Sequence, residues 1–186
     1  MKNKKEVYML VLNAVLIALG VVLSSFLQIP IYSDIRIDLS YVVIVVMCLM
    51  YNPIQAGLSA MSIAMLESSL FTQYGFSISW ATANFVVGFG ISLAFMLTKT
   101  MRKNWLKHII NVGTIVVSVA IGMLFVKTII ECNLYNIPFE VKIVKNSVAF
   151  GIDTAACLLG YLAILPRLLK MKLNGLDANN EIEEVN

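Results

Sequence analysis

Long apolar segments, repeated along most of the chain, limit the folds open to this sequence more than any other feature. A helix needs about 20 apolar residues to cross a hydrocarbon core of about 30 Å, and most of the segments approach or reach that length. Hydrophobic residues make up 59% of the 186 positions and charged residues only 13%. Soluble domains usually carry about a quarter charged residues. The sequence therefore predicts an all-α integral membrane protein, a six-transmembrane-helix bundle. The six segments cover approximately 8–27, 39–51, 54–71, 78–97, 109–130 and 144–165.

The second segment, 39–51, is the exception in length. A helix of about 13 residues rises only about 20 Å, which is less than the thickness of the hydrocarbon core. It can serve as a span only if it extends into 35–40 or is supported by neighbouring helices. Only Asn52 and Pro53 separate it from the third segment.

Basic residues give the expected orientation. They form three groups: before the first segment, between the fourth and fifth, and after the sixth. With six spans all three groups fall on one side of the membrane, which the positive-inside rule makes cytoplasmic. Both termini are then cytoplasmic, and the loops 28–38, 72–77 and 131–140 face the outside. The three groups are Lys2, Lys4 and Lys5; Lys99, Arg102, Lys103 and Lys107; and Arg167, Lys170 and Lys172.

The domain organisation is simple. Residues 1–173 are expected to form a single six-helix transmembrane domain. Residues 174–186 carry four acidic residues without apolar periodicity, which is typical of a disordered, solvated tail.

Ionisable residues inside apolar segments are costly and mark possible sites. Glu67, Lys127 and Lys145 fall in the outer third of their segments, and Asp153 lies deeper. Residues 142, 145 or 146, 149 and 153 share one helical face, as do 77, 80 or 81, 84 and 88. Two polar stripes that begin at the outer surface, with aromatic rings nearby, predict a pocket for a planar organic ligand with a polar tail. The candidate substrate-binding residues are Asp38, Tyr41, Glu67, Tyr74, Trp80, Asn84, Lys127, Lys145, Asn146 and Asp153.

Each of these residues has a structural alternative. The aromatic rings can form an interfacial belt, and Lys127 can snorkel to the surface. Glu67 can pair with a lysine, and Asp153 can bond to a polar side chain on another helix. His108 is interpreted as a loop residue at the cytoplasmic interface.

Catalytic and metal-binding patterns are missing from the sequence. It contains no paired histidines with a glutamate, no nucleophile elbow and no phosphate-binding glycine loop. Its cysteines, Cys48, Cys132 and Cys157, have no metal-ligand spacing and are interpreted as small apolar residues. We therefore expect no catalytic residue, no metal, no cofactor and no nucleic-acid partner. A helix-bundle assembly or chaperone subunit without a ligand is the alternative from another class, and an intramembrane enzyme ranks third.

Small residues on the first segment indicate a helix-docking face. Ala14 and Ala18 lie one turn apart, with Gly20 close by. Small residues at this spacing allow another helix to approach closely.

The sequence resembles the substrate-binding (S) components of energy-coupling factor (ECF) transporters, the vitamin importers of bacteria. The resemblance lies in the length, the six segments, the Ala14/Ala18 pair and several short stretches. Asn84-Phe85 and 137–139 are most similar to the riboflavin branch. The short stretches that carry the resemblance to the family as a whole are 37–40, 51–57, 70–71, 75–76 and 83–88.

Two positions depart from the riboflavin branch, since Ala81 replaces an acidic residue and Glu140 replaces an asparagine. The Leu-Phe and Gly-Phe pairs at 70–71 and 75–76 are similar to folate-type members. The vitamin, riboflavin, folate or another, therefore stays open.

The resemblance also implies a mechanism. An S component in the bacterial cell membrane captures a vitamin at its outer face under a lid formed by the loop between its first two helices. It then docks through the Ala14/Ala18 face on a transmembrane scaffold subunit served by two cytoplasmic ATPases. Toppling in the membrane carries the pocket inward.

Overall fold

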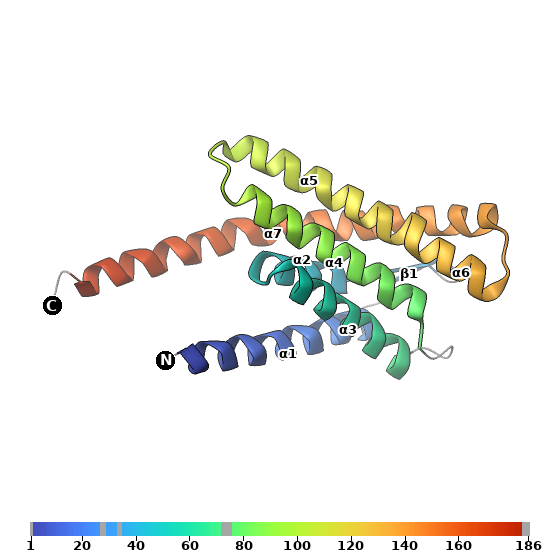
Figure 1. Cartoon of the computed structure of the whole chain (residues 1–186), viewed down its shortest axis with the longest axis horizontal. Helices are drawn as coiled ribbons and strands as arrows, with labels where there is room; N and C mark the ends of the chain where they lie inside the picture. Colours follow the sequence, from blue (N-terminus) through green and yellow to red (C-terminus); the bar gives the residue numbers. More distant parts are fainter. Residues whose placement is uncertain (1, 27–28, 33–34, 72–75, 184–186) are drawn as a thin grey trace.

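The structure is a computed structural model that describes the backbone of residues 2–26, 29–32, 35–71 and 76–183, and the side chains of 6–26, 38–71 and 76–164. Within these ranges the chain is helical apart from one short antiparallel hairpin (Figure 1). The elements are α1 (Lys2–Phe26), β1 (Ile29–Tyr32), β2 (Ile35–Ile37), α2 (Ser40–Met50), α3 (Pro53–Phe71), α4 (Ile78–Thr98), α5 (Asn104–Ala120), the π-helix η1 (Ile121–Lys127), α6 (Thr128–Tyr135) and α7 (Phe139–Glu183).

The helices coincide with the apolar segments of the sequence, so the prediction of a helical bundle is confirmed. In the part of the chain that the structure describes, five helical stretches are long and apolar enough to cross a membrane. The sixth predicted span corresponds to α2, which has only 11 residues. The count of six crossings stays a prediction. The five stretches are Glu6–Phe26, Pro53–Phe71, Ile78–Thr98, Asn104–Tyr135 and Phe139–Ile164.

The short helix α2 is held in the interior of the bundle. It does not begin before Ser40, because Ile35–Ile37 form β2, in which Ile37 pairs with Ile29 of β1. Its 11 residues rise only about 16 Å. However, Tyr41, Ile44 and Met47 are fully buried, and α2 contacts α1, α3, α4 and α7. Support from neighbouring helices, rather than extra length, therefore accommodates this segment.

Small residues bring α3 and α4 close together beside α2. A Cβ atom built on Gly88 would lie 2.8 Å from the carbonyl oxygen of Ala56 and 3.0 Å from the Cβ of Ala60. The thiol of Cys48 on α2 donates a hydrogen bond to the Gly88 carbonyl at 3.3 Å. Close backbone approach of this kind is the usual way in which helices associate in a membrane, where burial of apolar surface gives little driving force.

The segment Asn104–Tyr135 is one continuous helical stretch composed of α5, η1 and α6. It ends at Asn136, whose φ of 52° is left-handed, and Pro138 follows two residues later, a common way to stop a helix. The sequence predicts an outer loop over residues 131–140. That prediction is wrong for 131–135, since Glu131 lies inside α6, and for 139–140, since α7 begins at Phe139.

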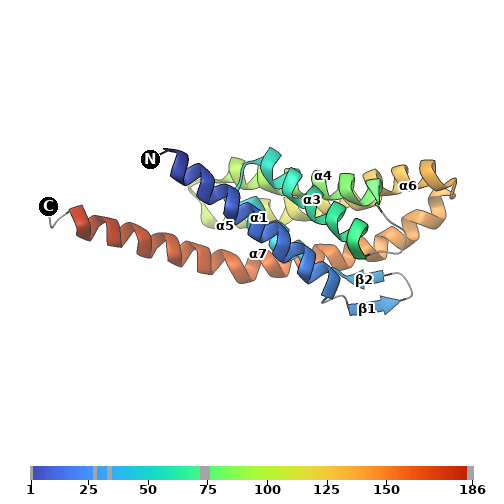
Figure 2. The same cartoon turned by 90° about the horizontal axis from the view of Figure 1, so that it is seen from below.

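The two termini lie at one end of the elongated bundle (Figure 1). The turn between α4 and α5 is at this end, whereas the turn between α6 and α7 is at the other, and β1 and β2 lie below the bundle in the second view (Figure 2). All three basic segments therefore approach the same end of the bundle. This is the arrangement expected for six spans, in which the three segments are separated by even numbers of crossings. α7 continues to Glu183, so residues 174–183 are helical, whereas their sequence predicts a disordered tail. The cytoplasmic assignment of this end and the domain division stay predictions.

We expect Gly88→Ala to destabilise the bundle by about 1–3 kcal/mol, because the added methyl group is forced against the backbone of α3. Thermal unfolding in detergent measures the change. Gly113→Ala on α5 is the matched control, since a Cβ atom there meets nothing within 4 Å. Equal melting temperatures for the two variants would contradict this account of the α3–α4 contact.

Candidate functional site

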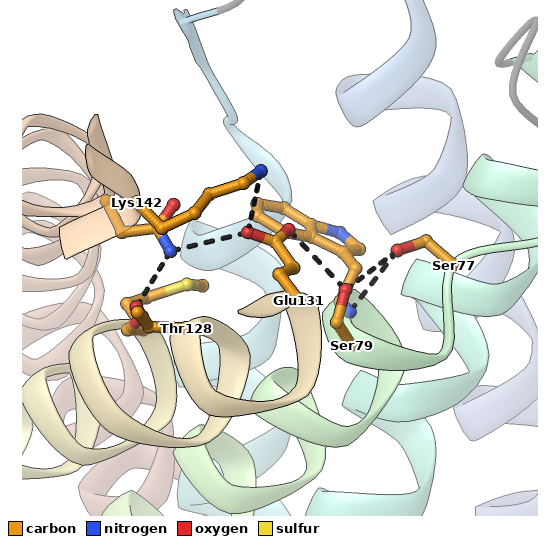
Figure 3. A network of polar contacts seen from close by, with 8 residues as sticks. Ser77, Ser79, Thr128, Glu131 and Lys142 are labelled. Carbon is orange, nitrogen blue, oxygen red and sulfur yellow. Dashed lines mark hydrogen bonds and ion pairs between the residues drawn. The ribbon is translucent and has the colours of Figure 1, made fainter. Parts of the chain in front are cut away.

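A largely buried ion pair joins α6 to α7 at the end of the bundle opposite the termini. The Glu131 carboxylate lies 3.1 Å from the ammonium of Lys142, and the two side chains are 11% and 18% exposed. The amide Nδ2 of Asn146 and the hydroxyl of Ser79 each donate to this carboxylate at 3.5 Å (Figure 3). One carboxylate therefore receives donors from both α4 and α7. In a low-dielectric interior such bonds are stronger than in water, so Glu131 fixes these helices relative to one another.

The π-helix η1 positions Glu131. The Thr128 hydroxyl donates to the carbonyl of Met123, five residues earlier, at 3.2 Å, and accepts from Asn146 Nδ2 at 2.8 Å. Gly122 allows η1 to approach α4, since a Cβ atom there would lie 2.9 Å from the Ala83 carbonyl oxygen. A π-turn adds a residue to the helical repeat and often marks a functional site. Here it sets the direction in which the following side chains point.

An aromatic ring covered by a cation lies beside this ion pair. The ammonium of Lys127, the last residue of η1, lies 4.1 Å from the centroid of the Trp80 ring, within the range of a cation–π interaction. Lys127 also interacts electrostatically with Glu131 and Asp153. Trp80 is oriented by the start of α4, where the Ser77 hydroxyl caps the helix by accepting from the Trp80 amide at 3.4 Å.

Several acidic side chains lie within electrostatic range of one another in this part of the bundle. Asp153 on α7 interacts electrostatically with Asp38, Lys127 and Glu67, and with the Tyr41 side chain. Asp38 precedes α2 and accepts a hydrogen bond from the Ser40 amide at 2.8 Å. Burial raises the pKa of the Asp38 carboxyl, and the hydrogen bonds with Ser40 oppose that rise.

Besides the Thr154 hydroxyl, two buried oxygen atoms on α4 and α7 have no hydrogen-bond partner among the residues that the structure describes. They are Oδ1 of Asn84, on a side chain 3% exposed, and Oδ2 of Asp153, on a side chain 2% exposed. The Asn84 amide nitrogen is already used, because it donates to the Trp80 carbonyl at 3.2 Å. Buried acceptors are almost always satisfied in native proteins, so these atoms are suited to accept from a bound molecule.

Most candidate residues thus lie on elements that meet in one region of the bundle: Asp38 and Tyr41 at the start of α2, Glu67 on α3, Trp80 and Asn84 on α4, Lys127 on η1, and Asn146 and Asp153 on α7. Lys145 is also on α7, with an exposed side chain. Tyr74 lies outside the described residues. Their roles in binding stay predictions.

The docking pair Ala14 and Ala18 is exposed on α1. Gly20 points elsewhere, since a Cβ atom there would lie 2.5 Å from the Ile63 side chain on α3. The small-residue face therefore consists of the alanines, and Gly20 belongs to the packed side of the helix.

Sequence reasoning missed Glu131, Thr128 and Ser79. Glu131 follows Lys127 by four residues, and this spacing places both on one helical face, a signal that was available. The π-turn carries no such signal. The interpretation of His108 as a loop residue is wrong, because it lies within α5 and its Nδ1 atom is 2.9 Å from the Tyr161 hydroxyl.

Comparison with known proteins gives consistent findings. Residues 4–170 match the model of a family described as ECF-type riboflavin transporter, S component. The fold is similar to the crystal structure of the S-component for biotin from an ECF-type ABC transporter, with a TM-score of 0.64 and 22% identity over 91% of this chain and 95% of that one. It is also similar to FolT bound with folic acid, with a TM-score of 0.55 and 17% identity over 80% of this chain and 88% of that one. No curated protein matches the sequence.

We expect Glu131→Ala to lower the free energy of unfolding by about 1–3 kcal/mol, because Lys142 and Asn146 lose a buried acceptor. Thermal unfolding without ligand measures this loss. Glu140→Ala is the control, since Glu140 is exposed in the first turn of α7. A loss of the same size in the control would show that Glu131 does not hold the helices together.

Proposed function

The chain belongs to the family of ECF-type riboflavin transporter S components, and from this premise we propose that it captures riboflavin among the buried polar residues of α2, α4, η1, α6 and α7. S components of ECF transporters are substrate-binding subunits for vitamins and not enzymes. The match over residues 4–170 is the observation that carries the choice of riboflavin.

The charges of the site support a ligand without net charge. The Lys142 ammonium is paired with Glu131, and Lys127 interacts with Glu131 and Asp153. Riboflavin is uncharged at neutral pH, whereas biotin and folic acid carry carboxylates that need a cation of their own. A site whose described lysines at these two positions already face carboxylates favours the uncharged vitamin.

The shape of riboflavin suits the same residues. Its flat isoalloxazine ring can stack on the Trp80 indole, a favourable arrangement for aromatic systems, once Lys127 swings aside on its flexible stem. The hydroxyl groups of its ribityl tail can donate to the buried acceptor atoms of Asn84 and Asp153. Ligand binding would then complete the hydrogen bonding of both side chains.

The orientation follows from the basic residues. We propose six spans in a bacterial cell membrane, with both termini in the cytoplasm and the site open to the outside. Under this orientation β1 and β2 belong to the outer connection between the first two spans, and β2 contacts α7. The hairpin is therefore the proposed lid over the vitamin.

The transport step requires partners. We propose that the exposed Ala14 and Ala18 on α1 dock on a transmembrane scaffold subunit that works with two cytoplasmic ATPase subunits. Exposed small residues one turn apart allow a partner helix to approach closely. The chain carries no phosphate-binding glycine motif, which fits ATP hydrolysis by the partners.

We expect Trp80→Ala to weaken riboflavin binding about 5- to 100-fold, because stacking on an aromatic side chain contributes on this scale. Quenching of flavin fluorescence by the purified protein measures the affinity. Trp105→Ala is the control, since Trp105 is 64% exposed on α5, at the other end of the bundle. Tighter binding of biotin or folate than of riboflavin would contradict the proposed vitamin.

We expect Ala14→Trp to abolish riboflavin uptake by cells while leaving riboflavin affinity unchanged, because the indole blocks the docking face of α1. Uptake of labelled riboflavin and binding to the purified variant are measured in parallel. Val117→Trp, at an exposed position of α5, is the control and should transport normally. Normal uptake by Ala14→Trp would exclude this face as the docking surface.

A further inference from the structure

A polar cavity lies among the ends of α2, α4 and α5, away from the proposed riboflavin site. Its volume is about 400 Å³. The turn between α4 and α5 is at the end of the bundle where both termini lie (Figure 1). The lining residues that matter for its chemistry are Tyr51, Ser92, Phe95, Lys99, Lys107 and Asn111.

The lysines of this cavity carry positive charge that no carboxylate neutralises within the part of the chain that the structure describes. Among the described residues the structure shows the ion pair Lys142–Glu131, and this pair lies at the opposite end of the bundle. Arg102 and Lys103 stand in the adjoining turn and are exposed. The cavity therefore presents an unbalanced positive potential and favours an anionic occupant.

The polar wall of the cavity is fixed by its own hydrogen bonds. Asn111 accepts from the Thr98 hydroxyl at 2.7 Å and donates to the Tyr161 hydroxyl at 3.1 Å, which His108 also contacts at 2.9 Å. The Tyr161 ring stacks on Phe95, with centroids 5.5 Å apart. These groups are satisfied without a ligand, so they hold the shape of the cavity while the lysines remain available.

Apolar and aromatic side chains place the cavity at the membrane boundary. Trp105, two residues before Lys107, is 64% exposed, and exposed tryptophans are typical of the headgroup level. Met96 lines the cavity and is 50% exposed, and the neighbouring Leu97 is 62% exposed. Cationic and apolar surfaces are thus adjacent at the level of the lipid headgroups, an arrangement that matches an amphipathic anion.

We propose that this cavity binds the phosphate group of an anionic phospholipid, with Lys99 and Lys107 contacting the phosphate and Met96 contacting the start of an acyl chain. Basic pockets between spanning helices commonly hold lipid headgroups in this way. The proposal rests on the membrane insertion of the bundle but not on the identity of the vitamin. The bound lipid would join the ends of α2, α4 and α5.

The test uses the full chain in detergent, titrated with phosphatidylglycerol and, separately, with phosphatidylcholine, with bound lipid counted by native mass spectrometry. Lys99→Gln combined with Lys107→Gln should weaken phosphatidylglycerol binding about 25-fold, or about fivefold for each lysine, the usual contribution of a basic side chain at an anionic lipid surface. The charge-matched control, Arg102→Gln combined with Lys103→Gln, should bind as the natural chain does. Lys99→Arg with Lys107→Arg should retain binding.

Three results would overturn the proposal. Equal losses in the two double glutamine variants would indicate diffuse attraction to the basic turn. Equal binding of phosphatidylcholine would show that the headgroup charge is not recognised. Displacement of phosphatidylglycerol by millimolar inorganic phosphate would assign the cavity to free phosphate. Riboflavin affinity is measured on the same variants and should be unchanged, so a failed lipid test leaves the proposed vitamin untouched.

Discussion

The bond between Glu131 and Lys142 is the interaction on which the polar end of this bundle depends. The Glu131 side chain is largely shielded from solvent, and buried polar groups need partners, so the carboxylate and its donors from α4 and α7 satisfy one another. Because donors converge from two helices, the network also fixes where Trp80 and Lys127 stand. Binding chemistry and helix packing therefore share the same residues, and a change at Glu131 affects both.

At the opposite end of the bundle, the buried polar groups are satisfied by a different kind of partner. There the hydroxyl of Tyr161 joins the side chains of His108 and Asn111 without a carboxylate, while Lys99 and Lys107 border the adjoining cavity. Between the two ends lies the buried apolar surface of α2. The molecule is thus polar at both ends for different reasons: one end carries the proposed vitamin site and the other the proposed site for an anionic headgroup.

The length of α2 connects the fold to the proposed function. An 11-residue helix cannot span the hydrocarbon core alone. Because α2 is buried among α1, α3, α4 and α7, it does not have to reach both surfaces of the membrane. Its early start is prevented by the pairing of β2 with β1. The residues just before the helix instead form β2 of the hairpin, and Asp38 lies two residues before the start of α2, within electrostatic range of Asp153.

The sequence by itself determined the helical class, the approximate limits of the long helices and the shared end of the three basic segments, because apolar length and charge are local properties. It also indicated Asp153, Asn84 and Trp80, since polar residues in apolar helices stand out. Only the tertiary structure decided that Glu131 is a buried acceptor within α6, and that His108 belongs to a network with Tyr161. Those partners lie 15 and 53 residues apart, and a π-turn without a sequence signature sets the direction of Glu131. Contacts between helices depend on how each helix is rotated about its axis and packed against its neighbours, and a local sequence pattern does not determine either.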